Sequence, residues 1–133
     1  MKGIDSSVLL RYILEDDPQF SKTATRFIDE DCTVKEPGFV NLVVLVEVIW
    51  SLRRQKGNRK DAVVAVIRDM LESRSLVLEK EDIVMEALRQ FEAGSAGFSD
   101  CLIACLNNHA NARPTFSFDK DAIKTGIFAA IKR

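Results

Sequence analysis

Short apolar segments alternate along this chain with longer segments in which apolar residues recur at helical spacing. Residues 2–4 precede a helical pattern in SSVLLRYILEDD, and SLVLE at 75–79 precedes another over Glu81–Ala93. Strands and helices that alternate at this spacing indicate βα units, which build a parallel sheet covered by helices on both faces. We therefore predict an α/β fold with three layers, in which helices flank a central parallel sheet of about four to five strands.

Breaking and capping residues set the expected boundaries of the helices and strands. The pair Pro37-Gly38 breaks the chain, Asn41 is a favourable helix N-cap, and Gly57 suits a helix C-terminus. We expect strands at 2–4, 32–35, 75–79 and 114–118, and helices after Asp5 and over 18–31, 41–57, 59–73, 81–93 and 99–112, followed by a short helical tail. No repeat or linker interrupts the pattern, so the 133 residues are expected to form a single domain, 1–133.

Composition limits the compartment and the partners. Apolar residues make up 47% and charged residues 29% of the chain, as in soluble globular proteins. No apolar run reaches the ~18 residues that span a bilayer, and Asp5 stands where a secretion signal would be apolar. We expect a cytoplasmic protein with no membrane partner and with its three cysteines reduced. Because the net charge is −1, contact with nucleic acid requires a local basic patch.

Four acidic residues occupy positions that suggest a shared site. Asp5 ends the first predicted strand, Asp119 ends the last one, and Asp100 lies in the first turn of a helix after a loop that contains glycine. Ligands bind such open sheets beyond the carboxyl ends of the strands, so these three belong near one rim. Glu47 lies in a helix with apolar neighbours, where an unpaired charge costs several kcal/mol.

Taken one at a time, these acids have simpler explanations. Asp5 and Asp100 could be helix-capping residues, and Asp119 could be a turn residue. Glu47 could extend to solvent or pair with Arg11 or Arg54. Together, however, converging carboxylates repel one another by about 4 kcal/mol for a pair ~4 Å apart at an effective dielectric of 20. A divalent cation removes this cost, and ligands that are all oxygen favour Mg²⁺ or Mn²⁺.

Four segments together resemble the PIN-domain ribonucleases, and specifically the VapC-type toxins of toxin–antitoxin pairs. They are IDSSVLLRYIL at 4–14, VVLVEVIWSLRR at 43–54, FSDCLIACL at 98–106 and TFSFDKDA at 115–122. They occur in the same order and spacing as in that family and span essentially the whole chain. The resemblance implies the PIN-like α/β/α fold and an endoribonuclease that hydrolyses RNA phosphodiester bonds, leaving 5′-phosphate and 3′-hydroxyl ends.

The resemblance also assigns site residues. Asp5, Glu47, Asp100 and Asp119 correspond to the acidic quartet that holds one or two Mg²⁺ or Mn²⁺ ions. Asp121 matches an acid that some members add to the metal site. Ser6 follows the first of these acids, and Ser117 precedes the last. Each carries a small hydroxyl that could contact the substrate. Many relatives carry Asn where this chain has Ser7. The partners implied are RNA, a cognate VapB-like antitoxin that inhibits the enzyme, and a second copy in a homodimer.

Three other features have competing interpretations. The segment RRQKGNRK at 53–60 is either a solvated helix end or a patch that contacts RNA phosphates through Arg53 and Arg54. Arg11 could also contact phosphate, or it could pair with an acid. Cys101, Cys105 and His109 fall on neighbouring positions of one helix, but a fourth zinc ligand is not evident. Trp50 is expected in the core, with base stacking as its alternative.

Two other classes of function remain open from the sequence. A receiver-type domain also gathers acids and Mg²⁺ at the rim of a parallel sheet, but it places an acid pair after its first strand, which this chain lacks. A noncatalytic binding domain with a PIN-like fold is the second alternative. Binding of a divalent ion, measured by calorimetry, separates this second class from the nuclease.

Overall fold

The computed structural model describes residues 1–55, 57 and 59–132 and confirms the α/β class. The chain divides into two compact units, Met1–Glu81 and Asp82–Arg133. Each contains parallel strands and helices, and the five strands of the described residues form a three-stranded and a two-stranded sheet. The single domain over 1–133 stays a prediction.

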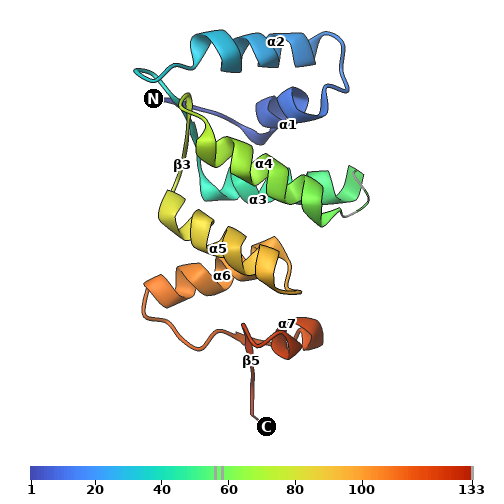
Figure 1. Ribbon diagram of the computed structural model, residues 1–133, viewed down its shortest axis with the longest axis vertical. Coiled ribbons are helices and arrows are strands. Elements are labelled where there is room, and N and C mark those ends of the chain that lie inside the picture. The colour runs from blue at the N-terminus through green and yellow to red at the C-terminus, as the bar shows by residue number, and fades with distance from the viewer. Residues whose placement is uncertain (56, 58, 133) are drawn as a thin grey trace. The chain divides into compact units, whose positions relative to one another are not determined.

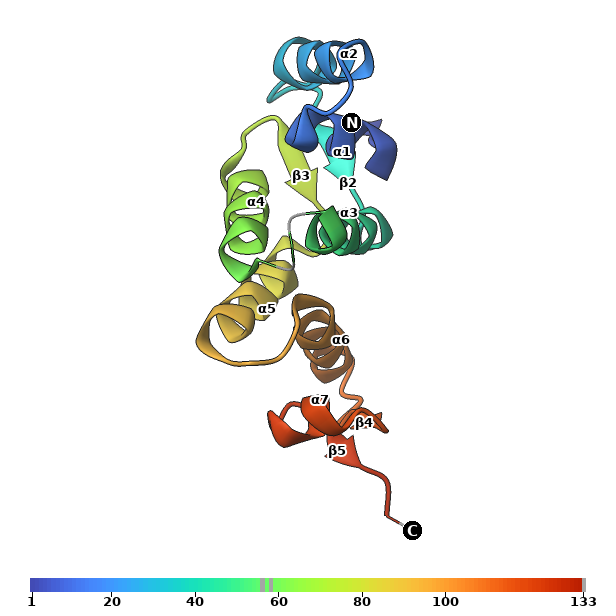
Figure 2. The same cartoon turned by 90° about the vertical axis from the view of Figure 1, so that its right-hand side faces the viewer.

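The N-terminal unit is built on a parallel sheet of three short strands. These are β1 (Lys2–Gly3), β2 (Gly38–Val40) and β3 (Leu76–Leu78), in the order β1-β2-β3. Gly3 aligns with Phe39, and Phe39 aligns with Val77. Figure 2 shows β2 and β3 side by side and pointing the same way. Because the strands are parallel, the residues that follow them, including Asp5 and Asn41, leave the sheet at its carboxyl edge.

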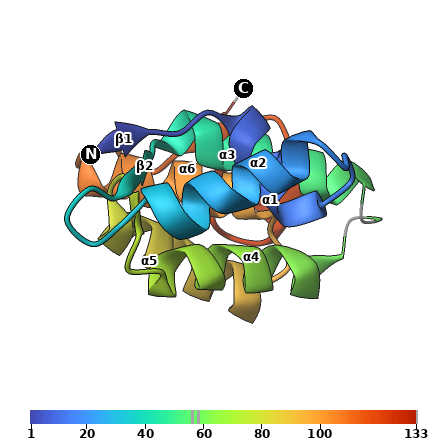
Figure 3. The ribbon, with the colours of Figure 1, turned by 90° about the horizontal axis from the view of Figure 1, so that it is seen from above.

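Four α-helices complete this unit: α1 (Ser6–Leu14), α2 (Phe20–Arg26), α3 (Leu42–Gln55) and α4 (Lys60–Glu72). A short π-helical turn, η1 (Phe27–Asp31), continues α2. Helix α1 packs against α2 and α3, and α4 packs against β3 and α3 (Figures 1 and 3). The side chains that are almost completely buried include Leu9, Val40, Leu45, Val48, Ile49, Leu52, Val63 and Ile67.

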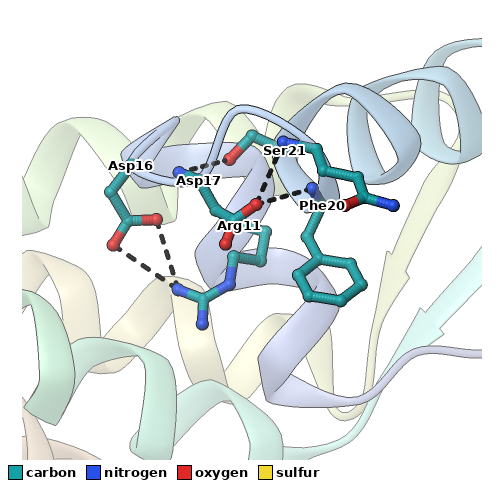
Figure 4. A network of polar contacts seen from close by, with 6 residues as sticks. Arg11, Asp16, Asp17, Phe20 and Ser21 are labelled. Carbon is teal, nitrogen blue, oxygen red and sulfur yellow. Dashed lines mark hydrogen bonds and ion pairs between the residues drawn. The ribbon is translucent and has the colours of Figure 1, made fainter.

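The connection from α1 to α2 is fixed by local polar contacts (Figure 4). The Asp17 carboxylate accepts hydrogen bonds from the backbone N–H of Phe20 at 2.8 Å and of Gln19 at 3.0 Å. These bonds satisfy donors at the start of α2 that have no partner within the helix. Arg11 of α1 forms an ion pair with Asp16 at 3.2 Å. Residues 15–17 therefore help to turn the chain between α1 and α2, which pack together.

The C-terminal unit contains α5 (Glu81–Ala93), which begins at the unit boundary, α6 (Phe98–His109) and α7 (Lys120–Lys124). Its two-stranded parallel sheet pairs β4 (Phe116–Ser117) with β5 (Ala129–Ala130). Helices α5 and α6 are joined by an edge-to-face contact between Phe91 and Phe98, with ring centroids 6.0 Å apart. A small apolar cluster holds the last segment against α6 and consists of Ala104, Ala122 and Phe128, with Ile123 and Ile127 at its margin.

The structure corrects two expected elements. The strand predicted at residues 32–35 is wrong, because Thr33 and Glu36 form a turn there: Thr33 N–H donates to the Glu36 carbonyl at 3.1 Å, and Glu36 N–H donates to Thr33 Oγ1 at 3.0 Å. The strand instead begins after Pro37, at Gly38. The segment after α7 ends in β5, which the sequence pattern did not predict.

The predicted helices agree with the structure to within a few residues at most ends. Part of the basic segment at 53–60 lies outside the described residues, which omit positions 56 and 58. Within the described ranges, none of the helices has the length and apolar character that crossing a bilayer requires.

Candidate active site

Three carboxylates line one pocket of the C-terminal unit. The pocket has a volume of about 480 Å³, and its acidic residues are Asp100, Asp119 and Asp121. The rest of its lining consists of Ser95, Ala96, Gly97, Ala122, Lys124 and Thr125. Asp100 comes from one helix and the other two acids come from the start of another, so the pocket gathers charge from separate segments.

Asp100 reaches this pocket because of the way α6 begins. Gly97, at the N-cap position, has an extended backbone, and Asp100 follows in the first turn. On either side of it in sequence, Phe98 and Cys101 are buried, and Phe98 packs against Phe91. The apolar residues thus anchor the helix while the half-buried Asp100 faces the pocket. A carboxylate at a helix N-terminus also interacts favourably with the helix dipole.

Asp119 and Asp121 are placed by the N-terminus of α7. The Asp119 side chain accepts hydrogen bonds from the backbone N–H of Asp121 at 3.0 Å and of Ala122 at 3.2 Å. The N–H of Asp119 in turn donates to Ser117 Oγ at 2.9 Å. Buried Ala122 holds the helix against Ala104 and Phe128. The cap leaves one Asp119 oxygen without either of these two bonds, and that oxygen is chemically available to a ligand.

The residues that line the pocket carry a negative formal charge in sum. Lys124 is the one basic residue in its lining, so three carboxylates and one ammonium give a formal charge of −2. Within the described part of the chain, no ion pair joins Lys124 to Asp119 or Asp121. The remaining negative charge would favour a cationic ligand.

Asp5 stands at the start of α1 in the N-terminal unit. It is the N-cap residue, and its Oδ2 accepts a hydrogen bond of 2.8 Å from Ser7 Oγ. This hydrogen bond is the main reason why the pKa of the Asp5 carboxyl is below its usual value. Asp5 is therefore held ionised and exposed where the chain leaves β1. This role of Ser7 was not predicted from the sequence. A hydroxyl two residues after an N-cap acid does, however, indicate a possible hydrogen bond to that acid.

The structure decides between the alternatives for Glu47. Its side chain lies on the exposed face of α3, together with Val43 and Trp50, so it extends to solvent, as one of the simpler explanations had it. The core placement of Trp50, in contrast, is wrong, because 58% of this residue is exposed. Glu47 therefore pays no burial penalty within the structure and is accessible to a ligand.

The remaining candidates differ in their partners. Arg11 pairs with Asp16, which is the structural alternative considered for it. The Arg54 guanidinium lies over the Trp50 ring, 4.7 Å from its centroid. Ser6 is half-buried in the first turn of α1, and Arg53 is half-buried in the last turn of α3. His109 forms a 2.8 Å contact with Glu86 rather than completing a site with Cys101 and Cys105, which are buried.

The donor set of the C-terminal pocket fits a hard cation. All three acids provide oxygen, which Mg²⁺ and Mn²⁺ prefer, and the pocket leaves room for water and phosphate oxygens as further ligands. Among the residues that the structure describes, no group of three His, Cys, Asp or Glu side chains is already arranged to hold an ion. Asp5 and Glu47 belong to the other unit, and their gathering with these acids stays a prediction.

Comparisons with known proteins relate the whole chain to a family. The model of the PIN domain matches residues 3–127, a range that contains all five acids. The VapC ribonuclease of Aquifex aeolicus (strain VF5) is 22% identical over 127 residues, which cover 96% of this chain and 93% of that protein. The crystal structure of Mycobacterium tuberculosis VapC20, described as a toxin that cleaves the sarcin-ricin loop, superposes with a TM-score of 0.45 at 19% identity and 95% coverage of both chains. On the match to the family model, the chain belongs to the PIN-domain family.

Proposed function

We propose that this protein is a metal-dependent endoribonuclease of the VapC toxin type. The observation that most supports this is the pocket that Asp100, Asp119 and Asp121 line, with a formal excess of negative charge in its lining. Membership of the PIN-domain family and the likeness to a VapC ribonuclease support the choice of RNA as substrate. The accompanying proposals are inhibition by a VapB-like antitoxin, a homodimer and a cytoplasmic location.

Asp100, Asp119 and Asp121 would hold Mg²⁺ or Mn²⁺, and Asp5 and Glu47 are proposed to complete the acidic set. A bound dication would activate water and stabilise the charge that develops on the attacking and leaving oxygens of the scissile phosphate. The chain's own contribution is to hold its carboxylates in place. The Ser7 hydroxyl holds Asp5 and favours its charged form, and the backbone N–H groups of α7 hold the Asp119 side chain.

The basic residues would orient the substrate. Lys124 lies in the lining of the acidic pocket and could contact a phosphate oxygen that a carboxylate would repel. Arg53 and Arg54 lie in the last turn of α3, the helix that also carries Glu47. Ser6 and Ser117 are proposed to contact the substrate or its water through their hydroxyls. Most of the affinity for RNA would come from such phosphate contacts, so binding should weaken as salt rises.

The decisive experiment compares Asp100→Asn with Asp82→Asn. Asp82 is an exposed residue of α5 outside the pocket lining, so its substitution is a matched control in the same unit. We expect the parent protein and Asp82→Asn to cleave single-stranded RNA with Mg²⁺ or Mn²⁺, and chelation to stop cleavage. Asp100→Asn should be inactive while its circular dichroism spectrum stays unchanged. Cleavage by Asp100→Asn at the parent rate would refute the assignment.

The noncatalytic PIN-fold domain remains the competing function. It keeps the acidic pocket but predicts no cleavage of any RNA with either metal. Calorimetry with Mn²⁺ and a search for products with 5′-phosphate ends distinguish the two, because only the nuclease gives both a binding isotherm and such products. The receiver-type alternative predicts instead that an Asp becomes phosphorylated by acetyl phosphate, and the match to the PIN-domain family model does not favour it.

A further inference from the structure

Helix α3 presents an exposed face that the proposed chemistry uses only in part. Val43, Glu47, Trp50 and Arg54 recur at helical spacing along this face. Val43 is 69% exposed and Trp50 is 58% exposed. The buried residues of the same helix are Val44, Leu45, Val48, Ile49 and Leu52. The fold therefore leaves its largest aromatic side chain outside the core, one turn beyond Glu47.

The exposed indole is already engaged by a cation. The Arg54 guanidinium carbon lies 4.7 Å from the centroid of the Trp50 ring, within the range of a cation–π contact. Within the described residues, Arg54 has no ion pair with a carboxylate. One ring face thus stacks on a guanidinium whose N–H groups remain available, and the rest of the indole is open to a ligand.

This pair has the chemistry that single-stranded nucleic acids require. An aromatic face stacks on a base of any sequence, and an adjacent guanidinium contacts phosphate. The cations concentrate at this end of the helix, with Arg53 beside Arg54 and with Arg59 and Lys60 after it. Arg59 is paired with Asp61 at 2.8 Å, so its charge is partly offset. The local charge complements a polyanion even though the whole chain has a net charge of −1.

A second copy of the chain would cover this face in a different way. In a two-fold contact each copy presents the same patch, and two antiparallel copies of α3 would place Arg54 of one copy beside Val43 and Glu47 of the other. Such a contact predicts a Trp50 response to protein concentration, whereas an RNA ligand predicts a response to nucleic acid. The cations at the C-terminal end of α3 are what favour a polyanion there.

We infer that Trp50 and Arg54 form a platform on which a base of single-stranded RNA stacks beside Glu47. This inference rests on the proposed function for its substrate class. Trp50 and Arg54 are positioning residues here: they hold a nucleotide next to a proposed catalytic carboxylate and take no part in bond cleavage. The platform would select unpaired RNA, because a base must leave its helix to stack on a protein ring.

Fluorescence tests the platform directly, because Trp50 is the only tryptophan of the chain. The protein is titrated in EDTA, where metal-dependent cleavage cannot occur, with a short single-stranded RNA and with an abasic ribose-phosphate of equal length. We expect the RNA to quench Trp50 emission and the abasic strand to leave it nearly unchanged. Equal quenching by both strands, or by neither, would overturn the inference.

Variants separate stacking from general effects on the fold. Trp50→Phe should keep RNA affinity within about threefold, and Trp50→Leu should lose about tenfold, measured by anisotropy of labelled RNA. Phe20→Leu makes the same kind of change at an aromatic residue that is 60% exposed on α2 and should have no effect. Arg54→Gln should lower the slope of log affinity against log salt by about 0.7, the value for one phosphate of a single strand. Unchanged binding by Trp50→Leu would refute the platform.

The readouts also separate this inference from the proposed function. RNA that quenches Trp50 without being cleaved by the metal-loaded protein would support the platform and refute the nuclease. RNA cleavage without quenching of Trp50 emission would support the nuclease and refute the platform. A Trp50 emission that shifts with protein concentration in the absence of RNA would show a self-association face and overturn the inference.

Discussion

The hydroxyl of Ser7 donates a 2.8 Å hydrogen bond to Oδ2 of Asp5, across the first turn of α1. The resemblance to VapC-type toxins leads us to expect Asn at this position, and an Asn amide can also donate a hydrogen bond. The Ser7 hydroxyl therefore supplies a donor of the kind that the expected amide would supply. It orders a carboxylate proposed for the active site.

Replacing Ser7 with alanine should raise the pKa of Asp5. The hydrogen bond favours the charged carboxylate and is the largest cause of its lowered pKa, so its loss moves the pKa up towards the usual value. The depressed pKa contributes stability above the unfolded-state value, and this contribution disappears as pH falls through the folded-state value. NMR titration of the Asp5 carboxyl carbon measures the change.

Ser6→Ala is the control for this titration. Its backbone N–H is retained, and the side-chain hydrogen bond to Asp5 comes from Ser7. An Asp5 pKa that is the same in Ser7→Ala, Ser6→Ala and the parent would contradict the role given to the Ser7 hydroxyl.

Asp119 should show two separable contributions, one to folding and one to metal binding. Asp119→Ala removes the cap on Asp121 and Ala122 and should lower the free energy of unfolding by about 1 kcal/mol. Asp119→Asn keeps a good N-cap and should stay within about 0.5 kcal/mol of the parent. Both should lose binding of Mn²⁺, because both remove the charge. Denaturant unfolding and calorimetry measure the two effects.

The comparison between the two Asp119 variants makes the prediction specific. Equal destabilisation by Ala and Asn would mean that the cap does not hold α7. Undiminished Mn²⁺ binding by Asp119→Asn would mean that this carboxylate is not a ligand.

Helix positions were predictable because their signals are local. Asn41 was expected as an N-cap, and its Oδ1 accepts a hydrogen bond from the N–H of Val44 at 2.9 Å. The strands were harder, because those described contain only two or three residues and are too short to show alternation. Val34 has the side chain of a strand former, yet it is 70% exposed in the turn that Thr33 and Glu36 close.

The face of α3 that meets the core was not predictable for a different reason. Residues on nearly every side of this helix are apolar, so periodicity did not distinguish the buried Ile49 from the exposed Val43 and Trp50. The order in which surrounding elements pack decides which face is covered. The acidic positions at 100 and 119 were readable because they follow a loop and a strand end, whereas Lys124 in the same pocket resembled any solvated lysine.

The thiols of the C-terminal unit should resist alkylation in the folded protein. Burial, followed by the nearby Glu86 carboxylate, raises the pKa of Cys105 to about 11, and Cys101 is likewise fully buried. A thiol with a raised pKa is neutral at pH 7, and the thiolate is the reactive form. Maleimide labelling followed by mass spectrometry should show both residues unmodified in the native protein and modified in guanidinium chloride. Rapid native labelling at neutral pH would disagree with this packing.

Gly38→Ala should destabilise the sheet that places Asp5. A Cβ at this position would collide with Ile4 Cδ1 and would lie 3.1 Å from Leu76 Cδ2 and 3.2 Å from Cys32 Sγ. Because these side chains belong to buried residues around β2, the added methyl requires repacking, which typically costs about 1–3 kcal/mol. Gly3→Ala on the neighbouring strand is the matched control, since nothing lies within 4 Å of its Cβ. Denaturant unfolding should show the loss in Gly38→Ala alone, and equal stability of the two variants would mean that β2 is not packed as described.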